Sequence, residues 1–207
     1  MKPVILLGGG GHAKVLLDSL ILQGHNILGF TDPQFQASIW GIPYLGHDEE
    51  IEKFSPKDIA LVNGIGAVGN NSIRKKLFCL YKERGYCFAK VIHPTAIVSP
   101  RAVIDEGAQI MAGAVMQANV HICSNVIVNT RVSIDHDCKI NDHVHIAPGA
   151  TLSGGVQIEE SAFVGAGAVV IQGIRIGTGS IVGAGAVVIK DVPRNRTVAG
   201  VPAKVIG

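Results

Sequence analysis

A six-residue period that runs unbroken through the C-terminal half constrains the fold of this chain more than any other feature. Every sixth residue from Val98 to Val188 is aliphatic, and the residue four places after each is small or β-branched nearly throughout, from Ala102 to Val192. A period of six is neither that of a helix nor that of a simple strand. It predicts a chain that turns after every six residues and places one large and one small side chain inward on each face.

Stacked coils follow from this period, and neighbouring coils bury a continuous core between them. Three faces per turn would make about 18 residues per coil. The alternative is chance alternation in a glycine-rich β-sandwich, but a sandwich gives no reason to hold one phase over so many residues. The chain has 26 glycines, with 5% aromatic and 16% charged residues. This composition suits short strands and tight turns better than a helical bundle.

The N-terminal half, residues 1–92, has a different pattern, in which short apolar segments alternate with helical ones. Strands are predicted at residues 4–7, 27–30, 59–62 and 87–92, and helices at residues 12–23 and 71–83. This alternation indicates an α/β domain with a short, Rossmann-like parallel sheet. We therefore expect two domains, an α/β domain over residues 1–92 and a coiled β domain over residues 93–207.

Charge, hydropathy and cysteine content exclude several classes of protein. The net charge is only +2, so no basic surface favours nucleic acid. The longest apolar run, residues 3–7, is too short for a membrane span, and the glycines that follow it argue against a secretory signal. The four cysteines show no CxxC spacing. This favours reduced thiols of a cytoplasmic protein over disulfides or a zinc site.

A glycine loop, residues 8–11, follows the first predicted strand and opens the first helix. Glycines let a backbone approach an anion, and the free N–H groups at a helix start attract phosphate. Asp32 comes just after the second strand, where a carboxylate can hydrogen-bond a ribose hydroxyl. Gly66 follows the third strand, at the same edge of the sheet. NAD is the rival ligand, but this half carries no second nucleotide-binding unit; a bare tight turn is the structural alternative.

Three histidines gather in residues 132–150, namely His136, His143 and His145. In the six-residue phase Ile134 and Cys138 point inward, so His136 falls at an outward corner, where core packing requires no imidazole. Asp135 and Asp137 flank it. A carboxylate that meets one ring nitrogen stabilises the imidazolium formed when the other nitrogen takes a proton, as acyl transfer to an amine or hydroxyl requires. A solvated surface histidine is the alternative, and His143 is expected at the surface.

The repeats, such as residues 164–169 (VGAGAV) and 182–187 (VGAGAV), resemble the left-handed parallel β-helix of hexapeptide-repeat acyltransferases. The stretch AGVPAK at residues 199–204 is similar to that superfamily too. LGGGGHAK, at residues 7–14, resembles the sugar acetyltransferase family that contains sialic acid O-acetyltransferases and UDP-4-amino-sugar N-acetyltransferases. The resemblance covers essentially the whole chain.

The resemblance implies an acetyl-CoA-dependent N-acetyltransferase acting on a nucleotide-linked amino sugar, of UDP-4-amino-4,6-dideoxy-sugar type, in glycan or nonulosonic acid biosynthesis. The family's catalytic pair is a histidine followed by an acidic residue, which His136 and Asp137 match as general base and orienting partner; Asp135 or an acid from another subunit stays open as that partner. His145 matches a contact to the acetyl-CoA end of the site. A homotrimer with active sites at subunit interfaces is also implied.

Substrate residues follow by the same analogy. The glycine loop is expected to hold the diphosphate of the nucleotide sugar, with Gly10, Gly11 and His12 along the phosphates and sugar. Thr31 and Asp32 are expected near the nucleoside.

A groove for acetyl-CoA, the co-substrate, is expected where small residues of neighbouring subunits leave room for an extended arm. The candidate residues are Gly154, Gly165, Ala166, Gly183 and Ala184. The alternative is that the glycines only serve corners that need a positive φ.

Two other functions stay open. A sialic acid O-acetyltransferase would keep the acetyl donor and replace the acceptor amine with a hydroxyl. A metal-dependent hydratase would bind zinc through His136, His143 and His145 between subunits, and a non-catalytic hexapeptide protein would keep the scaffold alone. The glycine loop together with Asp32 favours the nucleotide sugar.

Overall fold

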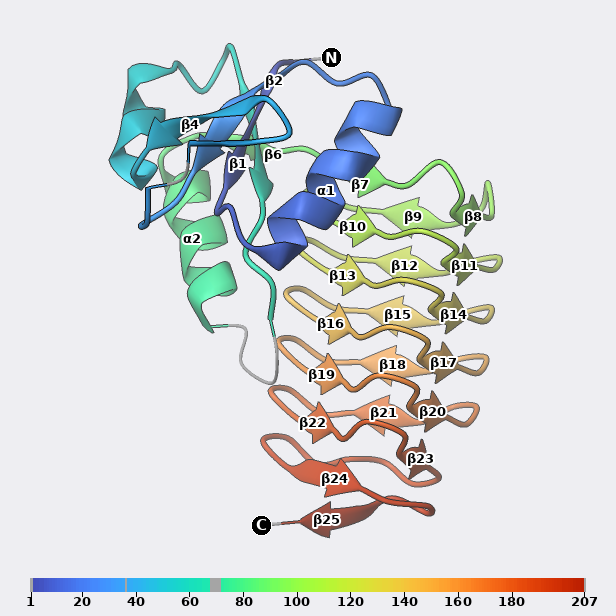
Figure 1. The fold of residues 1–207 in the computed structure, drawn as a ribbon. Helices are drawn as coiled ribbons and strands as arrows, with labels where there is room; N and C mark the ends of the chain where they lie inside the picture. Colours follow the sequence, from blue (N-terminus) through green and yellow to red (C-terminus); the bar gives the residue numbers. More distant parts are fainter. Residues whose placement is uncertain (1, 36, 68–71, 207) are drawn as a thin grey trace.

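The computed structural model describes residues 2–35, 37–67 and 72–206. Figure 1 shows an α/β domain at the N-terminus, seated on the upper coils of a three-faced β-helix. No helix in the described ranges is both long and apolar enough to cross a membrane.

The α/β domain is built on one six-stranded sheet with the strand order β3-β4-β2-β1-β5-β6. Its strands are β1 (Val4–Leu7), β2 (Ile27–Thr31), β3 (Ser38–Ile39), β4 (Ile42–Gly46), β5 (Ala60–Asn63) and β6 (Cys87–Phe88). Its helices are α1 (Gly11–Leu22), α2 (Ser72–Glu83) and the 3₁₀ helix η1 (Asp48–Lys53). Neighbouring strands are parallel except β3 and β4.

Helices cover both faces of this sheet because its central strand is apolar on both sides. Val4 and Leu6 of β1 are buried in the cluster that contains the inward face of α1. Ile5 and Leu7 alternate with them and are buried on the other face, in the cluster that contains α2. An uninterrupted apolar run is what a parallel strand buried on both faces requires.

The strand order places β1 between β2 and β5, so the chain leaves β1 towards one side and returns on the other. In open parallel sheets such a switch point leaves a crevice at the carboxyl ends of the strands. The glycine loop follows β1, Asp32 follows β2, and Gly66 comes three residues after β5. We call these three strand ends the carboxyl edge.

In the second domain each coil contributes one short strand to each of three faces, and the strands within a face pair in parallel (Figure 1). The first face contains β7 (Val91–Ile92), β10 (Gln109–Ile110), β13 (Ile127–Val128), β16 (His145–Ile146), β19 (Phe163–Val164), β22 (Ile181–Val182) and β24 (Thr197–Ala199). The second face contains β8 (Ile97–Val98), β11 (Val115–Met116), β14 (Ser133–Ile134), β17 (Thr151–Leu152), β20 (Val169–Val170) and β23 (Val187–Val188). The third face contains β9 (Val103–Ile104), β12 (His121–Ile122), β15 (Lys139–Ile140), β18 (Gln157–Ile158) and β21 (Arg175–Ile176). β25 (Lys204–Ile206) pairs antiparallel with β24.

The predicted period is confirmed by the register. Each strand pairs in parallel with the strand one coil later, as Ser133 with Thr151 and Lys139 with Gln157. The second residue of nearly every strand points inward, and from Ile110 onward these side chains and the small residues between them form one buried column. The inward positions of the six-residue repeat therefore form the hydrophobic core along the axis of the β-helix.

Corners between faces use two turn residues, the second of which has a positive φ. Glycine often occupies that position, as at Gly155 and Gly173 with φ of 70° and 71°, because it has no Cβ to clash. Asp137 has the same conformation with a φ of 59°. Gly154, Gly165 and Gly183 have no positive φ, so the corner requirement does not account for them.

The α/β domain packs on the first face and on the corner that joins the third face to the first. Lys82 of α2 pairs with Glu106 at 2.8 Å, and Lys75 pairs with Glu160 at 2.5 Å. His143 lies at the same corner, where its ring meets Phe78 of α2 edge-on at 5.6 Å. The prediction that His143 lies at the surface is therefore wrong, because a helix of the other domain covers it.

Some boundaries differ from those predicted. The segment 87–92 is two strands: β6 completes the α/β sheet, whereas β7 pairs with β10 in the first coil. The β-helix thus begins before the boundary expected after residue 92. The β3–β4 hairpin and η1 were not predicted, since segments this short carry little periodicity. Residue 71 of the second predicted helix lies outside the described residues.

Candidate functional site

The glycine loop enters α1 at the carboxyl edge without a capping side chain on Gly10. A Cβ built on Gly10 or Gly11 would meet nothing within 4 Å, whereas one on Gly8 would lie 2.7 Å from Ile65 Cδ1. Gly10 and Gly11 therefore border open space. The N–H groups of the first turn and the positive end of the helix dipole are available there to an anion.

Asp32 and Thr31 lie beside this loop at the end of β2. Asp32 Oδ2 accepts a hydrogen bond from the Gly9 N–H at 2.7 Å, and Oδ1 accepts one from the Gln34 N–H at 2.9 Å. The carboxylate thus fixes the loop, and its remaining lone pairs can accept further donors. Thr31 is buried, and its hydroxyl donates to Asp48 Oδ1 at 2.5 Å. Its side chain points into the domain rather than towards the edge.

His12 connects the glycine loop with the β-helix. Gln109 Nε2 donates to the Asn63 carbonyl at 2.8 Å, so Gln109 Oε1 is left to accept from His12 Nε2–H, also at 2.8 Å. Burial lowers the pKa of His12 to about 4, and the charge of Arg74 acts in the same direction. The ring is therefore neutral near pH 7. Gly66 lies against it, since a Cβ there would approach His12 Cβ to 3.2 Å.

His145 is buried where the segment after β5 crosses the first face. Its Nδ1–H donates to the Ala67 carbonyl at 2.5 Å, and Asn129 Nδ2 donates to Nε2 at 3.2 Å. Phe163 packs edge-on at 5.2 Å. Burial lowers the pKa of His145 to about 4 despite the bond to Ala67. The ring is thus a neutral part of the domain junction, and its contact with acetyl-CoA stays a prediction.

Arg74 of α2 is a buried cation beneath the carboxyl edge, with 2% of its surface exposed. Its Nη1 donates to the carbonyls of Asn63 and Ile65 at 2.8 and 2.9 Å. Within the described part of the chain, its Nε and Nη2 have no hydrogen-bond partner. Burial lowers the pKa of Arg74 to about 9, which leaves it charged near pH 7. It adds positive potential below the glycine loop.

His136 and Asp137 form the turn between β14 and β15, at the corner of the second and third faces. Asp137 Oδ2 accepts from His136 Nδ1–H at 2.7 Å, and Oδ1 accepts from Asn119 Nδ2, one coil earlier, at 3.1 Å. Asp135 accepts from the backbone N–H of His136 instead. Asp137, and not Asp135, is therefore the acid that contacts the ring.

The His136 ring lies outside the β-helix, with 61% of its side chain exposed. The hydrogen bond to Asp137 raises the pKa of His136, and the charge of Asp135 acts in the same direction. The same bond lowers the pKa of Asp137. With the proton on Nδ1, Nε2 carries the free lone pair. A neutral imidazole oriented in this way has the arrangement of a general base.

Gly154 lies one coil after His136, directly against its ring. A Cβ on Gly154 would come within 2.7 Å of both His136 Cε1 and Nε2. Alanine occupies the same turn position at Ala118, one coil before His136, and at Ala166. The backbone therefore tolerates a Cβ at this position in general, and the absence of a side chain at Gly154 leaves room for the imidazole.

The other small residues predicted for a cofactor groove lie at the corner between the first and second faces. A Cβ on Gly165 would approach the Ala184 nitrogen to 2.5 Å, so Gly165 permits close stacking on Gly183 and Ala184. Ala166 and Ala184 are exposed there. Gly154 lies across the second face from them. One chain therefore presents these residues on two edges of a face and not in a single groove.

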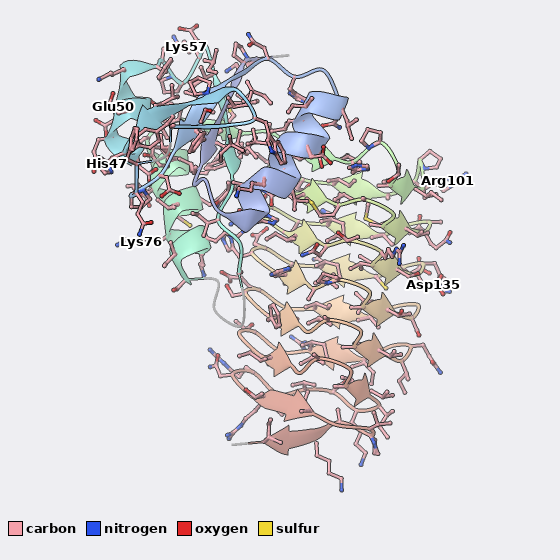
Figure 2. The ribbon with its side chains drawn as sticks, in the orientation of Figure 1. His47, Glu50, Lys57, Lys76, Arg101 and Asp135 are labelled. Atoms are coloured by element: carbon pink, nitrogen blue, oxygen red, sulfur yellow. The ribbon has the colours of Figure 1, made fainter. Side chains whose placement is uncertain are left out.

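The carboxyl edge and His136 lie on different sides of the β-helix. The edge contacts the first face through Gln109 and His145, whereas His136 stands at the opposite corner. Figure 2 shows Asp135, its neighbour in sequence, at the side of the stack away from the α/β domain. His136, His143 and His145 thus occupy two corners and a face, and they do not converge in one chain on a shared metal ion.

Three amides that bond to predicted site residues were missed in the sequence. Gln109, Asn119 and Asn129 contact His12, Asp137 and His145, respectively. Gln109 and Asn129 occupy outward positions that neither packing nor turn geometry explains, so an amide there is the signal that could have found them. Asn119 is a turn residue with a φ of 61°, a conformation that itself favours asparagine, so its amide gave no such signal.

Comparison with known proteins now places the chain. Residues 3–80 match the family model of the PglD N-terminal domain, and residues 119–154 and 155–190 match that of the bacterial transferase hexapeptide, six repeats. A variant of perosamine N-acetyltransferase from Caulobacter crescentus, solved with CoA and GDP-perosamine, is 37% identical with a TM-score of 0.94, over 100% of this chain and 98% of that chain. The chain belongs to the hexapeptide-repeat sugar acetyltransferase family.

Other members of this family agree with the assignment. The acetyltransferase domain of PglB from Neisseria gonorrhoeae FA1090, in complex with acetyl coenzyme A, is 39% identical with a TM-score of 0.93, over 99% of both chains. UDP-N-acetylbacillosamine N-acetyltransferase from Bacillus subtilis (strain 168) is 43% identical over 104 residues, which are 48% of this chain and 46% of that enzyme. The chain thus matches about half the length of this curated relative. The predicted fold, an α/β domain followed by a left-handed parallel β-helix, is confirmed.

Proposed function

We propose that this chain is an acetyl-CoA-dependent N-acetyltransferase acting on a nucleotide-linked amino sugar of the 4-amino-4,6-dideoxy type, in glycan or nonulosonic acid biosynthesis. The observation that carries the proposal is the free Nε2 of His136, held outward by the 2.7 Å bond from Nδ1 to Asp137. The relatives solved with CoA and GDP-perosamine and with acetyl coenzyme A support the two substrate classes. Both UDP- and GDP-linked sugars are therefore candidates.

His136 acts on the acceptor amine in this mechanism. As the amine nitrogen attacks the thioester carbonyl, a C–N bond forms and His136 Nε2 takes a proton from the nitrogen. Asp137 stabilises the resulting imidazolium through Nδ1. The tetrahedral intermediate collapses when its C–S bond breaks, and the leaving thiolate of CoA receives the proton from Nε2. Backbone amides beside the corner stabilise the oxyanion.

The glycine loop binds the diphosphate of the acceptor in this proposal. Gly10 and Gly11 leave open space at the start of α1, and Arg74 supplies a buried positive charge beneath it. Both the helix dipole and the positive charge of Arg74 then stabilise the bound phosphate. Arg74 Nε and Nη2 have no hydrogen-bond partner among the described residues. Asp32 lies where the ribose hydroxyls are expected.

We further propose a homotrimer in which the glycine loop and His136 of one site come from different copies. The separation of the two groups within one chain supports this arrangement. The second face supports it too, because its outward residues carry no charge: Ile97, Val115, Ser133, Thr151, Val169 and Val187. Ile97 is 67% exposed, and packing between copies would cover it. A cytoplasmic location, expected from the cysteines, stays a prediction.

Release of free thiol from acetyl-CoA tests the activity. We expect turnover with a UDP- or GDP-linked amino sugar, and a loss of about 10²–10⁴-fold in kcat for His136→Ala. Acetylation of sialic acid with no turnover of any amino-sugar nucleotide would establish the O-acetyltransferase instead. Activity of His136→Ala within tenfold of the parent would remove His136 as the base.

Subunit complementation tests the shared site. His136→Ala removes the base, and Gly11→Glu places a carboxylate where the diphosphate is expected. If the two groups come from different copies, co-expression of the two variants yields mixed oligomers with some intact sites, and these sites add activity at substrate concentrations well below the raised KM of Gly11→Glu. A mixture with no more activity there than its separate parents, with mixed oligomers confirmed by two affinity tags, would place both groups in one copy.

A further inference from the structure

A second cluster of reactive side chains lies on the third face, beyond the corner that carries His136 and away from the carboxyl edge, which contacts the first face. Asp105 follows β9, and Cys123 follows β12. His121 is the first residue of β12 and faces outward. Their ligand atoms all lie within 4.8 Å of one another. The proposed acetyl transfer uses none of the three.

The distances describe a compact donor set. His121 Nε2 lies 2.8 Å from Asp105 Oδ2 and 3.9 Å from Cys123 Sγ. Asn141 Oδ1 lies 4.0 Å from the same sulfur. The side chains of His121 and Asp105 are 39% and 38% exposed, so an ion can reach the cluster from solvent while its ligands are partly fixed.

The coil register explains why these residues meet. Ile104 and Ile122 point into the β-helix, so the residues on either side of them face outward. The Asp105 N–H bonds to the Ile122 carbonyl at 2.8 Å, and the Cys123 N–H bonds to the Ile140 carbonyl at 2.9 Å. Asp105, Cys123 and Asn141 thus form one column on successive coils. His121, two residues before Cys123, leans into that column.

We propose that Asp105, His121 and Cys123 bind a divalent transition-metal ion, Zn²⁺ in preference to Mg²⁺ or Ca²⁺. A thiolate, an imidazole and a carboxylate are the three ligand types that Zn²⁺ takes, at about 2.0–2.3 Å each. Hard cations prefer sites made of oxygen alone. Replacing the 2.8 Å contact of His121 and Asp105 with two bonds to one ion needs only small side-chain rotations.

The fourth position of a tetrahedral ion is then filled by water or by Asn141 Oδ1. Because the ligands come from two successive coils, the bound ion links these coils of the β-helix. Binding of the ion therefore stabilises the fold, since a ligand that binds the native state alone raises the free energy of unfolding. His136 stands at the corner where the third face begins, but it donates hydrogen bonds to Asp135 and Asp137 and to none of the three ligands, so acetyl transfer does not pass through the ion.

Cobalt titration tests the site in the full chain after dialysis against chelator. Co²⁺ bound to a thiolate gives charge-transfer absorption in the near ultraviolet, and a tetrahedral ion gives intense visible bands. We expect one Co²⁺ per chain with both signals, displaced by Zn²⁺. Cys123→Ser should abolish the charge-transfer band, and His121→Gln should weaken binding at least tenfold. Cys87→Ser and His47→Gln, which alter exposed residues outside the cluster, should leave both signals intact.

Thermal unfolding gives a second readout. Zn²⁺ should raise the Tm of the parent and of Cys87→Ser, but not that of Cys123→Ser. A charge-transfer band that survives in Cys123→Ser, or no Co²⁺ binding at tens of micromolar, would overturn the proposal. Circular dichroism of each metal-free variant shows that it is folded, so that lost binding reports on ligands and not on the fold. Loss of acetyl transfer on metal removal would contradict the separate role given to the ion.

Discussion

At the scale of single residues, two features of the corner at His136 act on its imidazole. The second turn residue is Asp137, in a left-handed conformation that glycine fills at many corners and that Asn119, Arg131 and Ser161 also adopt. Its carboxylate accepts from the ring and orients it. One coil later Gly154 stands where alanine is tolerated at Ala118 and Ala166, and its missing side chain makes room for the ring.

The bond between His136 and Asp137 predicts a pH dependence. The base must be neutral, so activity falls as pH drops through the pKa of His136, which Asp137 raises above its ordinary value. Asp137→Asn removes the negative charge and lowers that pKa. The acid limb of the kcat profile should then move to lower pH while kcat itself falls by about tenfold or more. An unmoved limb would show that another group controls it.

Gly154→Ala should impair catalysis with little effect on folding. The new methyl group would lie 2.7 Å from Cε1 and Nε2 of His136, so the ring must leave its position. We expect kcat to fall about 10-fold or more, since small misplacements of a base are costly. Gln172→Ala, at the same corner one coil later, is the matched control. If both variants keep full kcat, the position of the ring does not matter.

At the scale of elements, α1 and its glycine loop combine the proposed diphosphate site with a contact to the β-helix. The helix start faces open space at Gly10 and Gly11, while the next residue, His12, bonds to Gln109 of the β-helix. The sequence indicated the loop because strand, glycines and helix are adjacent in the chain. It gave no sign of the partner on β10, which is far away in sequence.

Gly11→Glu should raise the KM for the nucleotide sugar by about tenfold or more. A Cβ at this position meets nothing, and a carboxylate in the first turn stabilises a helix, so folding should be intact. The negative charge competes with the diphosphate for the same field. Gly11→Gln, which matches the size without the charge, should change the KM much less. Equal effects of the two variants would mean that bulk and not charge is responsible.

The strands of the β-helix offer a direct test of the inward and outward positions. Ile158 of β18 is fully buried, whereas Gln157 beside it is exposed. Ile158→Ala should lower the free energy of unfolding by about 2–5 kcal/mol. Gln157→Ala should stay within about 0.5 kcal/mol of the parent. Urea unfolding of both variants measures the difference, and similar values would contradict the assigned register.

At the scale of the whole molecule, the junction between the domains is polar and buried. His145, His12 and Arg74 meet there, and amides and carbonyls bond to both histidines and to Arg74 Nη1. Neutral histidines can pack next to the buried charge of Arg74, whereas protonated histidines would be repelled by it. The junction therefore holds the carboxyl edge in place near neutral pH and is destabilised in acid.

Acid should destabilise the molecule through His145. Its pKa is about 4 in the folded state against about 6.5 when unfolded. Between these values the unfolded chain binds a proton that the folded chain does not, so stability falls as pH drops from about 6.5 to about 4, by up to roughly 3 kcal/mol. His145→Gln does not titrate and should lose less Tm between pH 7 and pH 5. His47→Gln, at an exposed position, should respond to acid as the parent does.

The sequence alone determined the repeat, the inward residues and the outward position of His136 and Asp137. Each of these is a local consequence of period and turn chemistry, and so is the glycine loop at the start of α1. Tertiary structure decided what lies against what: α2 covers His143, the first face buries His145, and Gly154 lies under His136. Those contacts join residues that are distant along the chain or one coil apart. The period of the sequence specifies whether a side chain points inward or outward, but not which other part of the protein packs against it.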